Sequence, residues 1–183
     1  MESKVSARQV GFVLIAVLGS LVVANYDKLL PVRWLTYNAP DGSFSVELPG
    51  QPKVETLQAP VEGGGTAPMT AISVQPTASA AYMCSYLDHD NLTARPPAET
   101  LAAARDGGLA KIEGTAISEK SFSVHGYPAV QIQARARGNS LADMQIVLVR
   151  RRLYFLMVVN TVANDREQKS VERMFNSFKI VKP

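Results

Sequence analysis

An unbroken apolar segment near the N-terminus sets the first limit on how this chain of 183 residues can fold. From Val10 to Ala24 every residue except Ser20 is apolar or glycine, and no charged residue occurs between Gln9 and Tyr26. As an α-helix, residues 9–26 would be about 27 Å long, close to the thickness of the hydrocarbon core of a bilayer. We therefore predict a transmembrane helix over residues 9–26.

Charged and aromatic residues flank this segment as they do in membrane anchors. Lys4 and Arg8 precede it, which favours a cytoplasmic N-terminus and export of everything that follows. Tyr26 and Trp34 follow it and are predicted to lie at the membrane interface. The predicted organisation is a cytoplasmic N-terminus (1–8), a signal anchor (9–26), a tether (27–33) and a periplasmic domain (34–183), which makes a single-pass protein of the inner, cytoplasmic membrane.

The same segment has the length of a secretory signal peptide, so cleavage is the alternative. Val22 and Ala24 are small enough to satisfy a signal-peptidase site after Ala24. We expect the uncleaved anchor, because the uncharged segment is long enough to span the bilayer core. The helix also carries small residues that allow close contact with other transmembrane helices. These predicted packing residues are Gly11, Ala16, Gly19 and Ser20.

Beyond residue 34 the pattern predicts an α+β domain with a mainly antiparallel β-sheet flanked by helices. The Asp41-Gly42 dipeptide predicts a hairpin turn, and the runs at 144–149 and 153–159 are nearly all apolar, as in central strands. One helix is predicted over residues 97–111. Another is predicted after Asn164, with an apolar stripe of Val171, Met174, Phe175 and Phe178. Further strands are predicted at 69–75, 80–87, 117–124 and 129–137.

Charge and cysteine content argue against a nucleic-acid-binding protein and against a domain stabilised by internal disulfides. The formal net charge is only +3, which argues against the concentrated basic surface of a nucleic-acid-binding protein. A single cysteine, Cys84, cannot form an intramolecular disulfide, so the stability of the domain must come from packing.

The residues that could support catalysis or metal binding do not form a convincing set. Asp88, His89 and Asp90 are consecutive, so on a strand their side chains would point to alternate faces and would not converge on a metal. His125 precedes Gly126 in a predicted turn, and no nucleophile elbow surrounds Ser85. The sequence therefore predicts no catalytic residue, no metal site, no cofactor and no enzyme activity.

Three consecutive arginines, Arg150, Arg151 and Arg152, form the strongest charge feature and separate the two apolar runs. One interpretation is a solvated turn that resists aggregation. The other is a positive surface that contacts lipid phosphates or an acidic protein partner.

Several short motifs resemble a known family of exported domains. The motifs are Trp34, Tyr37, Pro40-Asp41-Gly42-Ser43-Phe44-Ser45-Val46, Pro49-Gly50 and Pro52, then Gly126 to Ala129, Arg152 to Tyr154 and Phe175 to Phe178. Together they resemble the PsbP-like fold, named after an extrinsic subunit of photosystem II. The resemblance implies a sheet sandwiched by helices and an accessory, assembly or binding role.

We therefore expect a non-catalytic, membrane-anchored accessory subunit of a membrane protein complex, photosynthetic or respiratory, with its domain on the periplasmic side. Its expected partners are integral membrane subunits and membrane lipid, without nucleic acid. The alternative is a stand-alone periplasmic protein that binds a ligand or another protein and has a cleaved or dispensable anchor.

Overall fold

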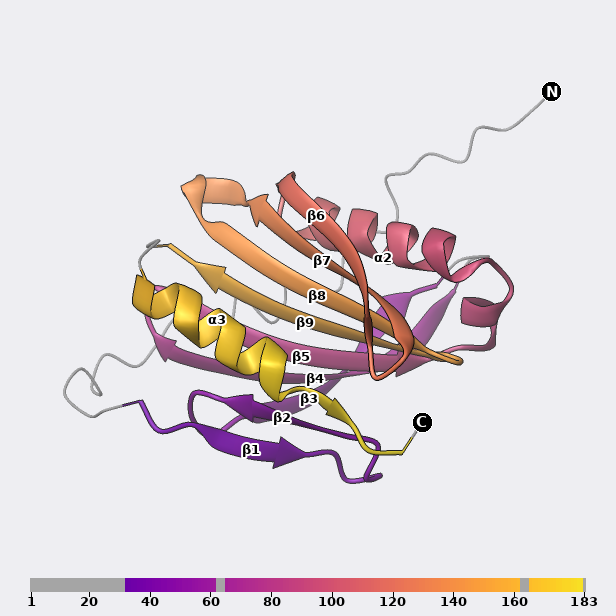
Figure 1. The fold of residues 1–183 in the computed structure, drawn as a ribbon, viewed down its shortest axis with the longest axis horizontal. Helices are drawn as coiled ribbons and strands as arrows, with labels where there is room; N and C mark the ends of the chain where they lie inside the picture. Colours follow the sequence, from indigo (N-terminus) through magenta and orange to yellow (C-terminus); the bar gives the residue numbers. More distant parts are fainter. Residues whose placement is uncertain (1–31, 62–64, 162–164, 183) are drawn as a thin grey trace.

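The computed structural model describes residues 32–61, 65–161 and 165–182, which form three layers (Figure 1). The middle layer is a seven-stranded antiparallel sheet in the order β3-β4-β5-β9-β8-β7-β6. Helix α2 covers one face, while helix α3 and a three-stranded sheet in the order β1-β2-β10 cover the other. The large sheet contains β3 (Lys53–Pro60), β4 (Thr66–Thr77), β5 (Ala80–Asp88), β6 (Thr115–Val124), β7 (Tyr127–Arg135), β8 (Leu141–Val149) and β9 (Arg152–Asn160). The remaining elements are β1 (Leu35–Asn38), β2 (Phe44–Leu48), β10 (Lys179–Ile180), α2 (Pro97–Lys111), α3 (Asp165–Ser177) and the short 3-10 turns η2 (Asp90–Thr93) and η3 (Arg137–Asn139).

The two apolar runs of the sequence form the adjacent strands β8 and β9 near the middle of the large sheet, as predicted. Strand β8 has buried apolar residues on both sides because both sides are covered, and Asp143 and Gln145 are its buried polar residues. Its residues Met144 and Ile146 pack in the cluster beneath α2, whereas Val147 and Val149 pack in the cluster beneath α3. Strand β9 alternates in the same way and joins the two halves of the core.

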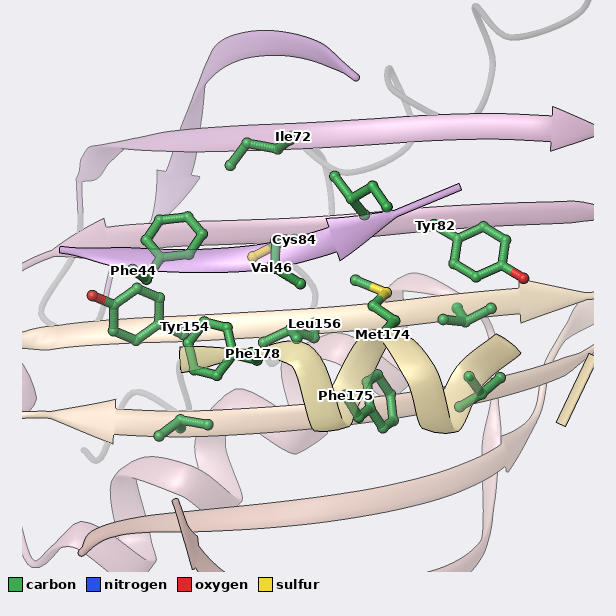
Figure 2. Close-up of a cluster of buried hydrophobic side chains, with 14 of the residues drawn as sticks. Phe44, Val46, Ile72, Tyr82, Cys84, Tyr154, Leu156, Met174, Phe175 and Phe178 are labelled. Carbon is green, nitrogen blue, oxygen red and sulfur yellow. The ribbon is translucent and has the colours of Figure 1, made fainter. Parts of the chain in front are cut away.

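The core between the large sheet and α3 is rich in aromatic rings (Figure 2). Phe44 of β2 lies 5.3 Å from the ring of Tyr154 on β9 and 5.8 Å from the ring of Phe178, measured between centroids. The predicted apolar stripe is buried here, at Val171, Met174 and Phe175 of α3 and at Phe178, which follows the helix. Edge-on and tilted contacts between rings add to the free energy gained by burying them.

The predicted fold class, an α+β domain with a mainly antiparallel sheet flanked by helices and preceded by one transmembrane helix, is wrong as stated. The described residues form mostly antiparallel β-sheet with two α-helices. Within residues 32–61, 65–161 and 165–182, no helix is long and apolar enough to cross a membrane. The predicted anchor over 9–26 lies outside the described residues.

Strand content was underestimated mainly at β3, which the sequence did not predict. Its hydrophobic alternation is broken, because Val54 is half exposed while the neighbouring Glu55 is less exposed. An edge strand needs few buried side chains, so main-chain pairing with β4 holds it in the sheet. The residues of such a strand carry little periodic signal.

Helix α2 has the predicted bounds and continues through Gly107 and Gly108, two residues of poor helix propensity. A Cβ atom on Gly108 would lie 2.7 Å from Cζ of Phe155 on β9. The absent side chain therefore allows the helix to approach the sheet closely, which offsets the poor helix propensity of glycine.

Candidate functional site

A pocket of about 320 Å³ opens at one end of the large sheet, where segments distant in the sequence meet. The β8–β9 turn, the β1–β2 turn and the C-terminal residues all lie at this end of the molecule (Figure 1). The lining residues are Asp41, Ser43, Asp88, Val149, Arg150, Arg151, Arg152, Tyr154 and Lys182. We call this feature the turn pocket.

The β8–β9 turn is tight, because Val149 pairs with Arg152 and leaves only Arg150 and Arg151 as the loop. Arg150 has φ +55°, in the left-handed region that favours glycine or asparagine. Two-residue hairpins usually place such residues in the loop. The arginine at this position therefore has a backbone cost that a glycine would avoid.

Arg152 points inward and connects the two sheets. Its Nε and Nη2 atoms donate to the carboxylate of Asp88 at 2.7 and 2.6 Å. Its Nη1 atom donates to Oδ2 of Asp41 and to Oγ of Ser43, both at 2.7 Å. Hydrogen bonds with Asp88 and then Asp41 outweigh the effect of burial and raise the pKa of Arg152 above its already high value. The guanidinium lies 4.7 Å above the ring of Tyr86, a cation–π contact.

Asp41 couples the β1–β2 turn to this arginine. Its Oδ1 atom accepts hydrogen bonds from the backbone N–H of Ser43 at 3.0 Å and from the Ser43 hydroxyl at 2.6 Å. Burial alone would raise the pKa of Asp41, but the hydrogen bonds from Ser43 and Arg152 lower it to about 2. The carboxylate therefore stays ionised at neutral pH.

The C-terminal segment closes the same corner. The backbone N–H groups of Val181 and Lys182 both donate to the carbonyl of Ser43, at 2.8 and 3.2 Å. The Nζ atom of Lys182 lies 3.7 Å from the position that a Cβ on Gly42 would occupy. The lysine is therefore placed above the β1–β2 turn, at the edge of the pocket.

The three predicted contact arginines thus have different surroundings. Arg152 is held by two carboxylates, and its side chain is only 20% exposed. Arg151 pairs with Asp90 at 2.9 Å, and its side chain is 67% exposed. Arg150 is also exposed, on the rim. The structure therefore divides the run into one internal residue and two surface residues.

The other predicted contact residues are not part of this site. Trp34 was predicted to lie at the membrane interface, and in the structure it packs on the domain. Its ring lies edge-on to Tyr82, with centroids 6.0 Å apart, and beneath the guanidinium of Arg173 at 4.6 Å. The predicted packing residues Gly11, Ala16, Gly19 and Ser20, together with Tyr26, lie outside the described residues.

Both histidines accept hydrogen bonds from backbone N–H groups. Nδ1 of His89 accepts from the backbone N–H of Asn91 at 3.2 Å and caps η2. Nδ1 of His125 accepts from the backbone N–H of Ile180 at 3.3 Å and ties the β6–β7 turn to β10. Among the residues that the structure describes, no three His, Cys, Asp or Glu side chains gather as a metal site would require. Burial raises the pKa of the Cys84 thiol, which keeps it protonated and unreactive.

Asp41, Ser43 and Lys182 are the pocket residues that sequence reasoning missed. Asp41 and Ser43 were noted only as part of a turn motif, and Lys182 lies at the end of the chain. No local pattern connects them with the arginines, because the contact between Asp41 and Arg152 spans 111 positions.

No protein-family model and no curated protein matches the chain. Among solved structures, it is similar to cyanobacterial PsbP (CyanoP) from Synechocystis sp. PCC 6803, with 10% identity and a TM-score of 0.52. That match covers 86% of this chain and 98% of CyanoP. A second match is PA94 from Pseudomonas aeruginosa, a protein of unknown function described as a candidate regulator. It has 11% identity and a TM-score of 0.48, and covers 82% of this chain and 98% of PA94. The likeness to CyanoP supports the predicted PsbP-like fold, although it does not confirm the individual signature residues.

Proposed function

We propose that this chain is a non-catalytic accessory protein that binds another protein of a membrane complex through the turn pocket. The finer expectation, from the sequence, is a photosynthetic or respiratory complex with this domain on its periplasmic side. The PsbP-like fold is compatible with such a role, but folds do not specify functions. Support for this function must therefore come from the residues of the turn pocket.

The observation that carries it is the pair of exposed arginines on the rim of the pocket. Arg150 occupies a left-handed backbone position, which costs about 1 kcal/mol for a residue with a side chain. The first residue of the two-residue β6–β7 loop, His125, also has a positive φ of +50°, and its side chain accepts a hydrogen bond from the backbone N–H of Ile180. An arginine kept where glycine fits better supports a role for its side chain, and the mouth of a pocket is where a partner would meet it.

The chemistry of the pocket favours binding over catalysis. Ser43 is the aliphatic hydroxyl in its lining, and its proton is directed at Asp41. A carboxylate with a pKa of about 2 is too weak a base to remove a proton from serine at neutral pH. The hydroxyl also accepts a hydrogen bond from Arg152, which further reduces its nucleophilicity.

Site-specific crosslinking in the source membranes tests this function. A photo-reactive amino acid replaces Arg151 in one variant and Arg137, an exposed arginine paired with Glu113 away from the pocket, in a control variant. Position 151 should yield one stoichiometric crosslinked protein that also co-purifies in mild detergent, and position 137 should not. A protein that migrates alone, without a crosslink from position 151, would overturn the proposal.

A further inference from the structure

We infer that the turn pocket binds an acidic segment of the partner protein, with Arg150, Arg151 and Lys182 as the contacting cations. This inference rests on the proposed function and names the partner chemistry that the function leaves open. Most hydrogen-bond acceptors of the pocket already have a donor within the protein, whereas its donors are in excess.

The acceptors in the pocket are largely occupied by internal donors. Oδ1 of Asp41 accepts two hydrogen bonds from Ser43, and its Oδ2 accepts from Arg152. Both carboxylate oxygens of Asp88 accept from the same guanidinium, at 2.7 and 2.6 Å. A ligand that offered mainly donors would therefore have to break this network, at a cost of about 1–3 kcal/mol for each group left unpaired.

Donors at the rim exceed these acceptors. A lysine ammonium has three N–H donors and a guanidinium has five. The bond from Nη1 of Arg151 to Asp90 uses only one of the donors of that arginine. Among the residues that the structure describes, four cationic side chains line the pocket, against the carboxylates of Asp41, Asp88 and the adjacent Asp90, so these side chains together have a formal charge of +1. A ligand rich in acceptors and carrying negative charge complements this arrangement.

The shape favours a protein segment over a lipid surface. The pocket is a hollow of about 320 Å³ with Tyr154 and Val149 in its lining, so it can receive side chains that project from a partner. A membrane surface offers a broad layer of phosphates, and Asp90 at the edge of the arginine turn, with 84% of its side chain exposed, would be repelled by such a layer. Carboxylates on a flexible segment can pair with the guanidinium groups in a bidentate manner and avoid Asp90.

Peptide binding to the purified full-length protein in mild detergent tests the inference. The probe is a fluorescent peptide that contains several glutamates, and the matched probe has glutamine at each of those positions. The glutamate peptide should bind at least tenfold more tightly than the glutamine peptide, and the difference should fall as salt is raised. Equal binding of the two peptides would overturn the inference.

Variants locate the site. R150Q with R151Q, and separately K182Q, should each weaken binding of the glutamate peptide at least fivefold. The control R137Q removes one exposed arginine elsewhere and should leave binding unchanged. Binding that persists in both pocket variants would overturn the inference. Tighter binding to vesicles of anionic lipid than to the glutamate peptide, abolished by the same variants, would overturn it in favour of a membrane contact.

The two proposals can fail separately. A partner crosslinked from position 151, together with no preference for the glutamate peptide, would overturn the acidic-segment inference and leave the accessory function standing. A chain that migrates alone and forms no crosslink in its own membranes would overturn the function, whatever the peptide result.

Discussion

The two faces of the large sheet are covered by side chains of different chemistry. Toward α3 the core is aromatic, and the ring of Tyr154 lies 5.2 Å from that of Phe178 and 5.3 Å from that of Phe44. Toward α2 the core is aliphatic and sulfur-containing, with Met144 and Ile146 fully buried. Only the aromatic face continues into the Arg152 network. The face that holds two sheets together thus also supports the pocket, whereas none of the buried core residues on the α2 face lines it.

The largest effect on stability is expected from Phe44→Ala. Phe44 is 1% exposed and contacts the rings of Tyr86, Tyr154 and Phe178, so its loss should lower the free energy of unfolding by about 4 kcal/mol. The matched change on the other face, Met144→Ala, should cost about 3 kcal/mol. Urea unfolding monitored by circular dichroism measures both. A larger loss for Met144→Ala would show that the aromatic face is not the more strongly packed one.

Arg152→Gln should have the next largest effect. It leaves the carboxylates of Asp41 and Asp88 without their shared cation, and we expect a loss of about 2 kcal/mol because the arginine is only partly buried. Arg151→Gln changes the neighbouring residue, whose ion pair with Asp90 is exposed, and should cost less than about 0.5 kcal/mol. Chemical denaturation of both variants checks the difference. Equal losses would contradict the division of the arginine run into internal and surface residues.

The α2 face can be tested at two adjacent glycines. Gly108→Ala would place a methyl group 2.7 Å from Phe155, so the helix or the ring must move, at a cost of about 2 kcal/mol. Gly107→Ala meets nothing within 4 Å and should stabilise the protein by up to about 1 kcal/mol through helix propensity. Thermal unfolding should therefore shift in opposite directions for the two variants. Shifts of the same sign would mean that close packing does not explain Gly108.

The smallest expected effect is the acid dependence contributed by Asp41. Its pKa is lowered to about 2, so its ionised form stabilises the folded state above pH 4 and loses that contribution as the pH falls toward 2. Asp41→Asn should be less stable than the wild type at pH 6, and the difference should shrink below pH 4. Urea unfolding between pH 6 and pH 2 measures this change. A difference that grew on acidification would contradict the ion pair with Arg152.

Local patterns in the sequence determined the elements whose energetics are local. The apolar stripe predicted α3, and the runs at 144–149 and 153–159 predicted two central strands, because burial on both faces favours apolar residues on both sides of a strand. The bounds of α2 were also predicted. Edge strand β3 was not, since main-chain pairing needs no particular side chains.

Only the tertiary structure decided what the three arginines do. Strand alternation places Arg152 on the same face as Tyr154, but nothing near it in the sequence predicts that Asp41 and Ser43 lie on that face, across 111 and 109 positions. The three consecutive arginines are therefore one partly buried residue that links the two sheets and two exposed cations at the mouth of a pocket. The sequence determines which side chains are charged. The packing of segments distant in the sequence determines whether each charge is paired inside the protein or exposed.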